Sequence, residues 1–426
     1  MAFPSPRSRT SYLAALFVIL AIGTFLRIPS PLFSSPDAPL RALAPLHPTA
    51  GFNQIGFDEG LYRNYVNQLI SAGLTSYPDI VDRYIEVQKT LTGSILPPLR
   101  FLFIFSAYAW HQIFGTEALA ALHAVASFFS ILTLLLSTLF AWRLKGPAWA
   151  IAVAALMSFA PTQIHMSQHA LVDGFFTFWA LLCLWLLWEN LRAPHHALFL
   201  VAYTLALSLM VLTKENAFFV FVALMAIIVL NRWLQFGVVT RELLLCSVAG
   251  PLLGFVVLIF LSGGLETLRT SYQLSVGKNY QLAYAIMTGD GPWQRYLVDL
   301  LLVSPVVLLL AIGAAFRLDR SQKPELFLFS FIAVSYLVMC NIKYGMNLRY
   351  ANMWDMPLRV LAFGQIAAFC APLQRYRTLV LSAAVAVVCA VEMRQYIILF
   401  VQYPLYELVT EGLLRALHIL KSAPTP

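Results

Sequence analysis

Residues 119–142 read LAALHAVASFFSILTLLLSTLFAW, a run of 24 residues without one Asp, Glu, Lys or Arg. A helix needs about 20 mostly apolar residues to cross the core of a bilayer. The run is also too long and too continuous for the alternating strands, roughly ten residues each, of an outer-membrane barrel. This stretch therefore predicts a membrane-spanning helix, and it decides the fold class.

Comparable apolar runs recur along the rest of the chain. Of its 426 residues, 60% are hydrophobic and 11% are charged, whereas soluble globular proteins carry roughly 25% charged residues. The first run follows Arg7 and Arg9, and Pro-rich sequence follows it instead of a small-residue cleavage site, so we interpret it as a retained span. The composition thus predicts an all-α polytopic membrane protein. The runs lie at 12–28, 96–114, 119–142, 147–164, 168–189, 197–212, 216–231, 242–261, 298–316, 326–342, 357–373 and 378–391.

The run at 96–114 decides the topology. If it lies in the interface or re-enters, about 11 transmembrane helices remain, with the N-terminus inside. The inside segments then hold twelve basic and four acidic residues, and the remaining segments hold sixteen of each. Each short inside loop carries Lys or Arg, which is typical of cytoplasmic loops. If 96–114 spans instead, all later loops change sides, and the basic loops after 142, 189 and 316 face outward. We therefore favour 11 spans.

This topology places two long loops, 29–95 and 262–297, on the outer face. Because the bulk outside the bilayer then lies on one face, we expect the chemistry there. No inverted repeat of the kind found in many transporters is visible. We expect one membrane module at 1–261, which includes the first outer loop, and a second part at 262–426 with the second loop and the C-terminal helices.

An acidic pair, Asp58-Glu59, stands in the first outer loop within GFDEGLYRNY at 56–65. The apolar residues that follow it have helical spacing, which predicts an amphipathic helix on the membrane surface. A purely structural alternative makes Asp58 the N-cap and Glu59 a first-turn acid that the helix dipole favours. The spacing alone favours this alternative. The apolar residues are Leu61, Tyr62, Tyr65, Val66, Leu69 and Ile70.

Further charged residues stand where other apolar runs meet the outer face. Each has a structural alternative: a solvated carboxylate, an adjacent Lys–Glu pair, or an aromatic belt with bases that reach the interface. Together they gather acids and bases at one face, which is typical of a site for a phosphorylated amphiphile. The residues are His169, Asp173, Lys214 with Glu215, Lys343 and Arg349.

An ordered set of short motifs between residues 25 and 360 resembles the GT-C fold glycosyltransferases that use lipid-linked sugars. The resemblance is strongest to the superfamily of protein mannosyltransferases and lipid A aminoarabinose transferases. The matching motifs are Phe25-Leu26-Arg27, Phe57-Asp58-Glu59-Gly60-Leu61-Tyr62, Pro97-Pro98-Leu99, Gly115-Thr116-Glu117-Ala118, Ser167 to Asp173 with Phe175 and Phe176, Leu212-Thr213-Lys214-Glu215, and Arg349-Tyr350 before Pro357.

The resemblance implies an integral membrane glycosyltransferase, a hexosyl- or pentosyltransferase. Such an enzyme moves a sugar, with inversion, from a polyprenyl-phosphate donor to an extracytoplasmic lipid, glycan or protein acceptor. The resemblance also implies that Asp58 is the catalytic base and that Glu59 is its neighbour in the acceptor or metal site. The donor phosphate is then expected at Lys214, Lys343 and Arg349, and the substrates at Tyr62, Arg63, His169 and Asp173.

Two positions depart from the family pattern. Ile95-Leu96 stand where a polar residue often precedes the Pro pair, and His123 stands where an Arg is frequent. The first departure argues against a metal site built there, so no cofactor is assigned and a divalent metal stays open. The loop at 262–297 is too short for an added luminal domain. This favours a compact prokaryotic enzyme of the plasma membrane whose active site faces outside.

Two other function classes remain open from the sequence. A transporter or flippase for a phosphorylated amphiphile would place charges near mid-span, whereas the charges here cluster at outer ends. A non-catalytic scaffold would use Asp58 and Glu59 only as helix caps. The net charge of +8 reflects orientation in a membrane protein, so we expect no nucleic-acid partner.

Overall fold

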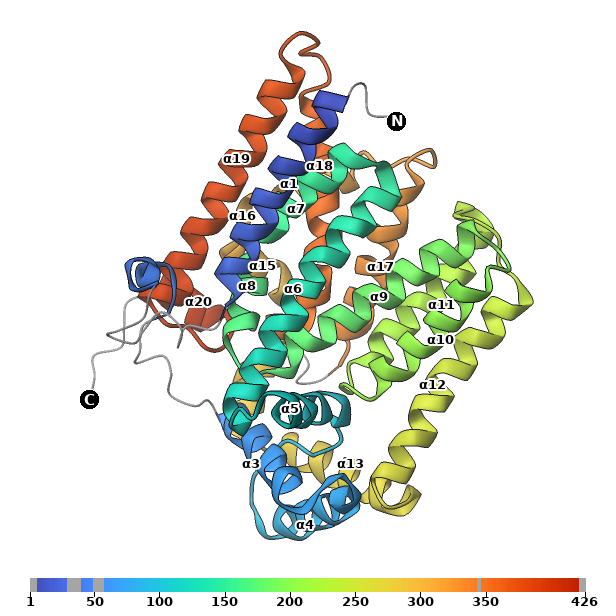
Figure 1. Ribbon diagram of the computed structural model, residues 1–426, viewed down its shortest axis with the longest axis vertical. Coiled ribbons are helices and arrows are strands. Elements are labelled where there is room, and N and C mark those ends of the chain that lie inside the picture. Colours follow the sequence, from blue (N-terminus) through green and yellow to red (C-terminus); the bar gives the residue numbers. More distant parts are fainter. Residues whose placement is uncertain (1–5, 29–39, 49–56, 343–345, 421–426) are drawn as a thin grey trace.

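The structure is a computed structural model that describes residues 6–28, 40–48, 57–342 and 346–420. Within these ranges all regular secondary structure is helical, which confirms the all-α fold (Figure 1). The elements are α1 (Pro6–Arg27), η1 (Arg41–Leu46), α3 (Phe57–Ala72), η3 (Leu74–Ser76), α4 (Tyr77–Thr90), α5 (Phe101–Phe114), α6 (Ala118–Lys145), α7 (Pro147–Ser158), α8 (Pro161–Gln168), α9 (Val172–Arg192), α10 (Ala197–Val211), α11 (Ala217–Leu234), α12 (Arg241–Leu261), α13 (Leu265–Asn279), α14 (Ala283–Gly289), α15 (Arg295–Val303), α16 (Pro305–Ala315), α17 (Lys323–Cys340), η4 (Leu348–Trp354), α18 (Asp355–Phe369), α19 (Arg377–Tyr396), η5 (Ile397–Gln402) and α20 (Thr410–Ala416).

Long apolar helices make the chain an integral membrane protein. In the described part of the chain, seven helices are long and apolar enough to cross a bilayer: α1, α6, α9, α11, α12, α17, and α19 with its continuation η5. The pair α7 and α8, bent by 55° at its break, makes an eighth if it counts as one span. Each of the eleven predicted spans falls on a helix or helix pair, and their exact number stays a prediction.

Helix α5 lies within the apolar run at 96–114, which decides the topology. It begins after the Pro97-Pro98 pair and has 14 residues, so at about 1.5 Å per residue it falls short of the roughly 30 Å core of a bilayer. Figure 1 shows α5 lying across the end of the long helices, where α3, α4 and α13 also gather. This position fits an interfacial helix.

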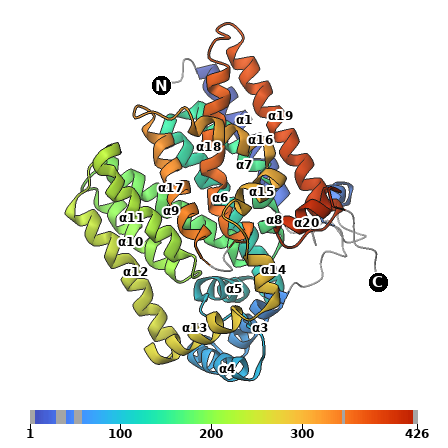
Figure 2. The same cartoon turned by 180° about the vertical axis from the view of Figure 1, so that it is seen from behind.

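The two predicted outer loops pack against each other through α4 and α13 (Figure 2). The Lys278 ammonium lies 3.3 Å from the Lys89 carbonyl oxygen to which it donates, and the Ser94 hydroxyl donates to the Ser275 carbonyl at 3.0 Å. Because both segments lie at one end of the bundle, an even number of spans separates them along the chain. A spanning α5 beside the six predicted spans up to α12 would make that number odd.

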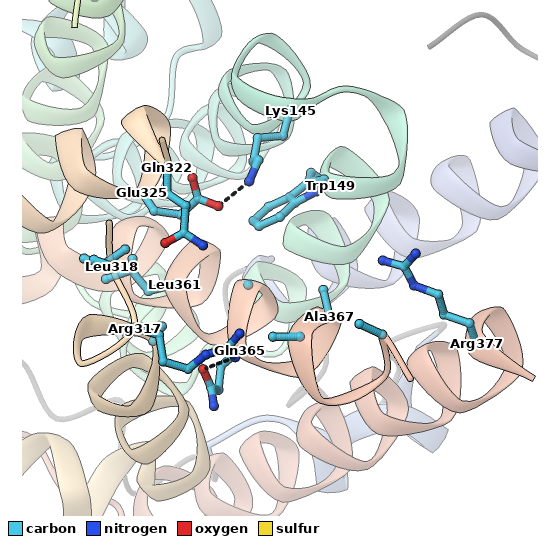
Figure 3. Close-up of a pocket in the computed structure, with 14 residues that line it drawn as sticks. Lys145, Trp149, Arg317, Leu318, Gln322, Glu325, Leu361, Gln365, Ala367 and Arg377 are labelled. Atoms are coloured by element: carbon cyan, nitrogen blue, oxygen red, sulfur yellow. Dashed lines mark hydrogen bonds and ion pairs between the residues drawn. The ribbon is translucent and has the colours of Figure 1, made fainter. Parts of the chain in front are cut away.

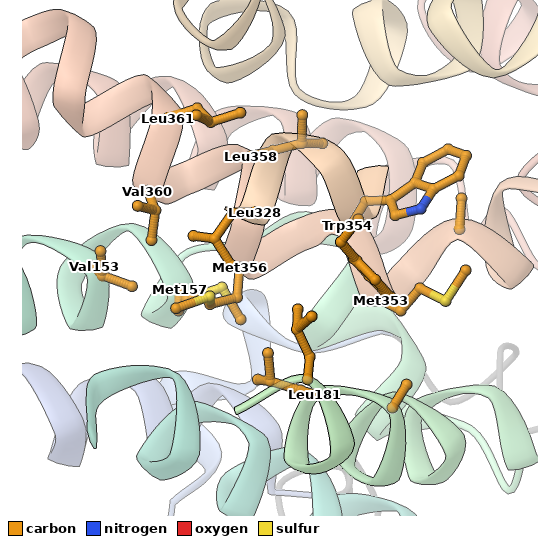
Figure 4. Packing of buried hydrophobic residues seen from close by; sticks show 14 of the residues in the cluster. Val153, Met157, Leu181, Leu328, Met353, Trp354, Met356, Leu358, Val360 and Leu361 are labelled. Carbon is orange, nitrogen blue, oxygen red and sulfur yellow. The ribbon is translucent and has the colours of Figure 1, made fainter. Parts of the chain in front are cut away.

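A tightly packed core supports η4, which carries one of the predicted site residues, Arg349. Figure 4 shows Met157 of α7, Leu181 of α9 and Leu328 of α17 in the cluster around the end of η4. Trp354 closes η4 as a fully buried side chain, and its indole N–H donates to the Ser335 hydroxyl at 2.8 Å. Packing on three spans therefore fixes the position of this short helix.

Arg27, in the first of the motifs, has a structural place. Its guanidinium is fully buried and donates to the carbonyl oxygens of Gly23 at 2.8 Å and Met157 at 2.7 Å, and to the Ser130 hydroxyl at 3.1 Å. Buried charge without such partners is costly. Arg27 therefore ties the end of α1 to α6 and to the bend between α7 and α8.

The shared position of α4 and α13 makes a topology prediction. In a background without the five native cysteines, Asp82→Cys on α4 and Glu266→Cys on α13 should react with an impermeant maleimide from the same side of sealed vesicles. Arg320→Cys, between α16 and α17, should react only from the other side. Labelling of Asp82→Cys and Glu266→Cys from opposite sides would refute this arrangement.

Candidate active site

Arg349 of η4 lies at the centre of a buried ionic cluster. Its Nη2 donates to Asp58 Oδ2 at 2.9 Å and to Asp173 Oδ2 at 3.1 Å, while Nη1 donates to Glu407 Oε1 at 2.6 Å. These carboxylates come from the first turn of α3, the start of α9 and the segment before α20. One guanidinium thus joins segments that are far apart in the sequence.

Asp173 is held by two cations and is closed to solvent. Its side chain is 2% exposed, and its second oxygen, Oδ1, accepts from the Lys214 ammonium. Lys214 also lies 4.0 Å from the centre of the Tyr350 ring. Burial lowers the pKa of Lys214 to about 8, although Asp173 opposes the shift. The alternative of a solvated carboxylate at this position is therefore wrong.

The neighbouring residues Lys214 and Glu215 form ion pairs with different partners. Glu215 accepts from Nη2 of Arg100 at 3.3 Å, and Nη1 of the same Arg100 donates to the Tyr62 phenol. Tyr62, four residues after Asp58 on α3, is fully buried. The simple Lys–Glu pair considered from the sequence is therefore wrong, because each side chain binds a different segment.

The two acids of the first outer loop face different surroundings. Asp58 reaches Arg349 with a side chain that is 21% exposed, against 15% for Glu407 and 2% for Asp173. It is therefore the most accessible of the carboxylates around Arg349. The helical spacing predicts a helix from Asp58 onward, and α3 covers this segment from Phe57, with Asp58 in its first turn and bound to Arg349.

Glu59 is buried and turned toward α6 and the break before α9. Its Oε1 accepts from the Ala170 backbone N–H at 2.6 Å and lies 3.6 Å from both His123 Nε2 and His169 Nδ1. Burial acts to raise the pKa of Glu59, but the hydrogen bond and charge of His169, with His123 and the Ala170 N–H, lower it to about 2. Glu59 thus anchors α3 to the bundle.

This low pKa makes a stability prediction. Because the folded-state pKa of Glu59 is about 2 against an ordinary 4.5, its stabilisation is present above pH 4.5 and is lost as the pH falls toward 2. Glu59→Gln should remove a stabilisation of roughly 3 kcal/mol at pH 6 and flatten the profile below pH 4.5. Unfolding in detergent between pH 2 and 6 measures this, with exposed Glu266→Gln as control. A Glu59→Gln profile parallel to the wild type would contradict it.

The structure brings most of the predicted site residues together, with two exceptions. Arg63 lies on the exposed face of α3 and makes none of the contacts described above. Lys343 lies outside the described residues. The residues that do gather around Arg349 and Glu59 are Asp58, Glu59, Tyr62, His169, Asp173, Lys214 and Arg349.

Sequence reasoning missed several members of the cluster. Arg100 carried a signal, since it directly follows the matched Pro97-Pro98-Leu99 motif. Glu407 carried none, because it lies beyond the last apolar run in a stretch without a motif. Its Oε1 binds Arg349 and its Oε2 accepts from the Asn347 amide at 2.8 Å. Tyr406 stacks edge-on against His169, with ring centres 4.9 Å apart.

The described part of the chain shows no clear set of ligands for a metal ion. No group of three or more His, Cys, Asp or Glu side chains is arranged there to hold one.

Comparison with known proteins gives a family match and a shared fold. Residues 61–271 match the family model of dolichyl-phosphate-mannose-protein mannosyltransferases. Among curated proteins, none matches the chain by sequence. ArnT from Cupriavidus metallidurans bound to undecaprenyl phosphate has a TM-score of 0.58 at 13% identity, over 96% of this chain and 76% of that one.

Two structures from Archaeoglobus fulgidus share the same architecture. The oligosaccharyltransferase in its apo form has a TM-score of 0.57 at 13% identity, over 90% of this chain and 56% of that one. The oligosaccharyltransferase AglB in complex with an inhibitory peptide and a dolichol-phosphate has a TM-score of 0.57 at 12% identity, over 92% and 56%. The chain thus spans little more than half the length of these archaeal proteins. The chain thus shares the fold of these membrane proteins, and its residues 61–271 are similar to the dolichyl-phosphate-mannose-protein mannosyltransferases.

Proposed function

We propose that this protein transfers a sugar from a polyprenyl-phosphate donor to an extracytoplasmic acceptor. The observation that carries the proposal is an accessible carboxylate, Asp58, bound to the cation Arg349 in a buried cluster at one end of the membrane helices. The donor class is supported by the similar structures, which hold undecaprenyl phosphate in ArnT and dolichol-phosphate in AglB. A lipid-linked donor would reach this end of the bundle from within the bilayer.

The proposed reaction is a single displacement at the anomeric carbon. A hydroxyl or amide group of the acceptor attacks this carbon, and its proton passes to a carboxylate oxygen of Asp58. The bond from the anomeric carbon to the phosphate oxygen breaks, and the lipid phosphate leaves with the electron pair. Attack opposite the leaving group inverts the configuration. Glu59 does not reach solvent, so we assign it a positioning role.

Arg349 and Lys214 supply the positive charge for the leaving phosphate. In the structure both cations are bound to carboxylates, so the donor phosphate must replace one of them. Asp58 is the partner that can be displaced, because it is the most exposed and, among the described residues, it is held only by its contact of 2.9 Å with Arg349. If the phosphate replaced Asp58 at Nη2 of Arg349, the guanidinium would stabilise the phosphate charge. Asp58 would then be free to accept the proton of the acceptor. Lys343 remains a predicted further ligand.

A transfer assay with defined donors tests the proposal. Purified protein in nanodiscs would be incubated with radiolabelled polyprenyl-phosphate hexoses and pentoses and with candidate lipid, glycan and peptide acceptors. Sugar covalently joined to an acceptor would establish the activity and name the donor. If intact donor instead moved across the membrane of proteoliposomes and no covalent product formed, the protein would be a flippase.

The location follows from the same chemistry. Lipid-linked donors are needed where nucleotide sugars are absent, so we place the site on the outer face of a prokaryotic plasma membrane. The division into a module at 1–261 and a second part at 262–426 is part of this proposal. In it, the first part supplies Asp58, Asp173 and Lys214, and the second supplies Arg349 and Glu407.

A further inference from the structure

A second charged pocket lies at the opposite end of the bundle from Asp58. It has a volume of about 330 Å³ and lies between the ends of α6, α16 and α18 and the starts of α7, α17 and α19. Its charged side chains are Lys145, Arg317, Arg377 and Glu325. Figure 3 shows these side chains and Trp149 arranged around the pocket. Three cations against one acid leave it with a net positive charge.

The cations of this pocket differ in how they are bound. The Lys145 ammonium pairs with Glu325 and lies 4.4 Å from the centre of the Trp149 ring. Among the described residues, the Arg317 guanidinium makes a single hydrogen bond, from Nη1 to the Gln365 amide oxygen at 3.2 Å. Within the described residues the Arg377 side chain makes no hydrogen bond or ion pair, and it extends toward the pocket (Figure 3). In the described part of the chain, two guanidinium groups therefore remain without a neutralising carboxylate.

An apolar groove of about 650 Å³ continues from this pocket along α1, α7, α18 and α19. The two hollows share helices at adjacent positions: Trp149 and Gly364 line the pocket, whereas Ile151 and Phe363 line the groove. On α19, Arg377 lines the pocket and Thr378 begins the groove. Because α1 and α19 are membrane-spanning, the groove opens to the acyl chains of the bilayer.

We propose that the pocket and the groove together bind an anionic phospholipid in the leaflet opposite the active site. Arg317 and Arg377 hold the phosphate of its headgroup, since guanidinium groups match phosphate oxygens in geometry as well as charge. Trp149 lies at the boundary, where indole rings favour the membrane interface. One acyl chain follows the groove past Ala386. An inorganic anion would use only the polar pocket, and the groove beside it therefore favours a lipid.

The test measures lipid binding to the purified full-length protein. Melting temperature in detergent would be followed during titration with phosphatidylglycerol, phosphatidylcholine or inorganic phosphate. Of these three additives, only phosphatidylglycerol should raise the melting temperature. The double variant Arg317→Gln/Arg377→Gln should weaken the apparent affinity by at least about tenfold. The matched control Arg320→Gln/Lys323→Gln, which removes two cations outside the pocket from the same end, should bind like the wild type.

A second variant tests the groove. Ala386→Phe fills the groove without touching a charge, and it should also reduce the effect of phosphatidylglycerol. An equal loss in the control double variant would overturn the proposal in favour of general surface attraction. An equal rise with inorganic phosphate, or an unchanged response of Ala386→Phe, would overturn the assignment to a lipid. None of these results depends on sugar transfer.

Discussion

Asp58→Asn is expected to lower the rate of sugar transfer by about 10²–10⁴-fold, the range that a general base supplies. The amide cannot take the proton of the acceptor, although it keeps the shape of the side chain. Its oxygen can still accept the hydrogen bond of 2.9 Å from Arg349, so the fold should remain intact. Transfer rates at saturating donor, beside thermal unfolding of the same preparations, measure both effects.

The control for this variant is Asp82→Asn, an exposed change on α4 at the same end of the molecule. It should transfer sugar at the wild-type rate. Donor affinity should be equal to or higher than wild type in Asp58→Asn, because Arg349 then faces one negative charge fewer. Full activity of Asp58→Asn would overturn the assignment of the base.

Asp173→Asn is expected to cause a large loss of stability. Its carboxylate lies between Lys214 and Arg349 with 2% of the side chain exposed. Removing one partner of a buried ion pair typically costs roughly 3–5 kcal/mol, since the remaining charge stays buried without compensation. The free energy of unfolding in a mild detergent measures this. Asp82→Asn is again the control and should change it by less than about 0.5 kcal/mol.

A double variant separates the pair from other effects of this change. Lys214→Met removes the uncompensated ammonium that Asp173→Asn leaves behind. Because the two groups are in contact, their effects should not add. The double variant should recover much of the stability lost in Asp173→Asn alone. Simple addition of the two losses would show that Asp173 stabilises the protein through Arg349 and not through Lys214.

The sequence predicts the fold well because the bilayer imposes strict requirements. Backbone groups in a membrane must be satisfied within the chain, so a long apolar run has little choice but helix. The helix from Phe57 was predictable in the same way from the spacing of Tyr62, Tyr65 and Val66. The tilt of α5 and the packing of α4 on α13 were not, since contacts between distant segments leave no periodic pattern.

The site was predictable only where chemistry and motif coincide. Asp173, Lys214 and Arg349 stand out because charges are rare in this chain and these three lie at or near the ends of apolar runs, whereas Asp58 stands out as part of an acidic pair before a helical pattern. Their pairing is a matter of three dimensions: Asp173 and Arg349 are 176 positions apart yet share hydrogen bonds of 3.1 and 3.2 Å. The different surroundings of Asp58 and Glu59 depend on how α3 turns against α6 and α9.

The contact between Arg349 and Glu407 has a consequence for biosynthesis. Glu407 follows α19 and η5 in the sequence, so the ribosome delivers it after all the other segments of the cluster. Until then Arg349 lacks a carboxylate that lies 2.6 Å from its Nη1 in the finished structure. A nascent chain can therefore insert the long helices that precede Glu407 and still hold an incomplete ionic cluster, which closes only after Glu407 has been added.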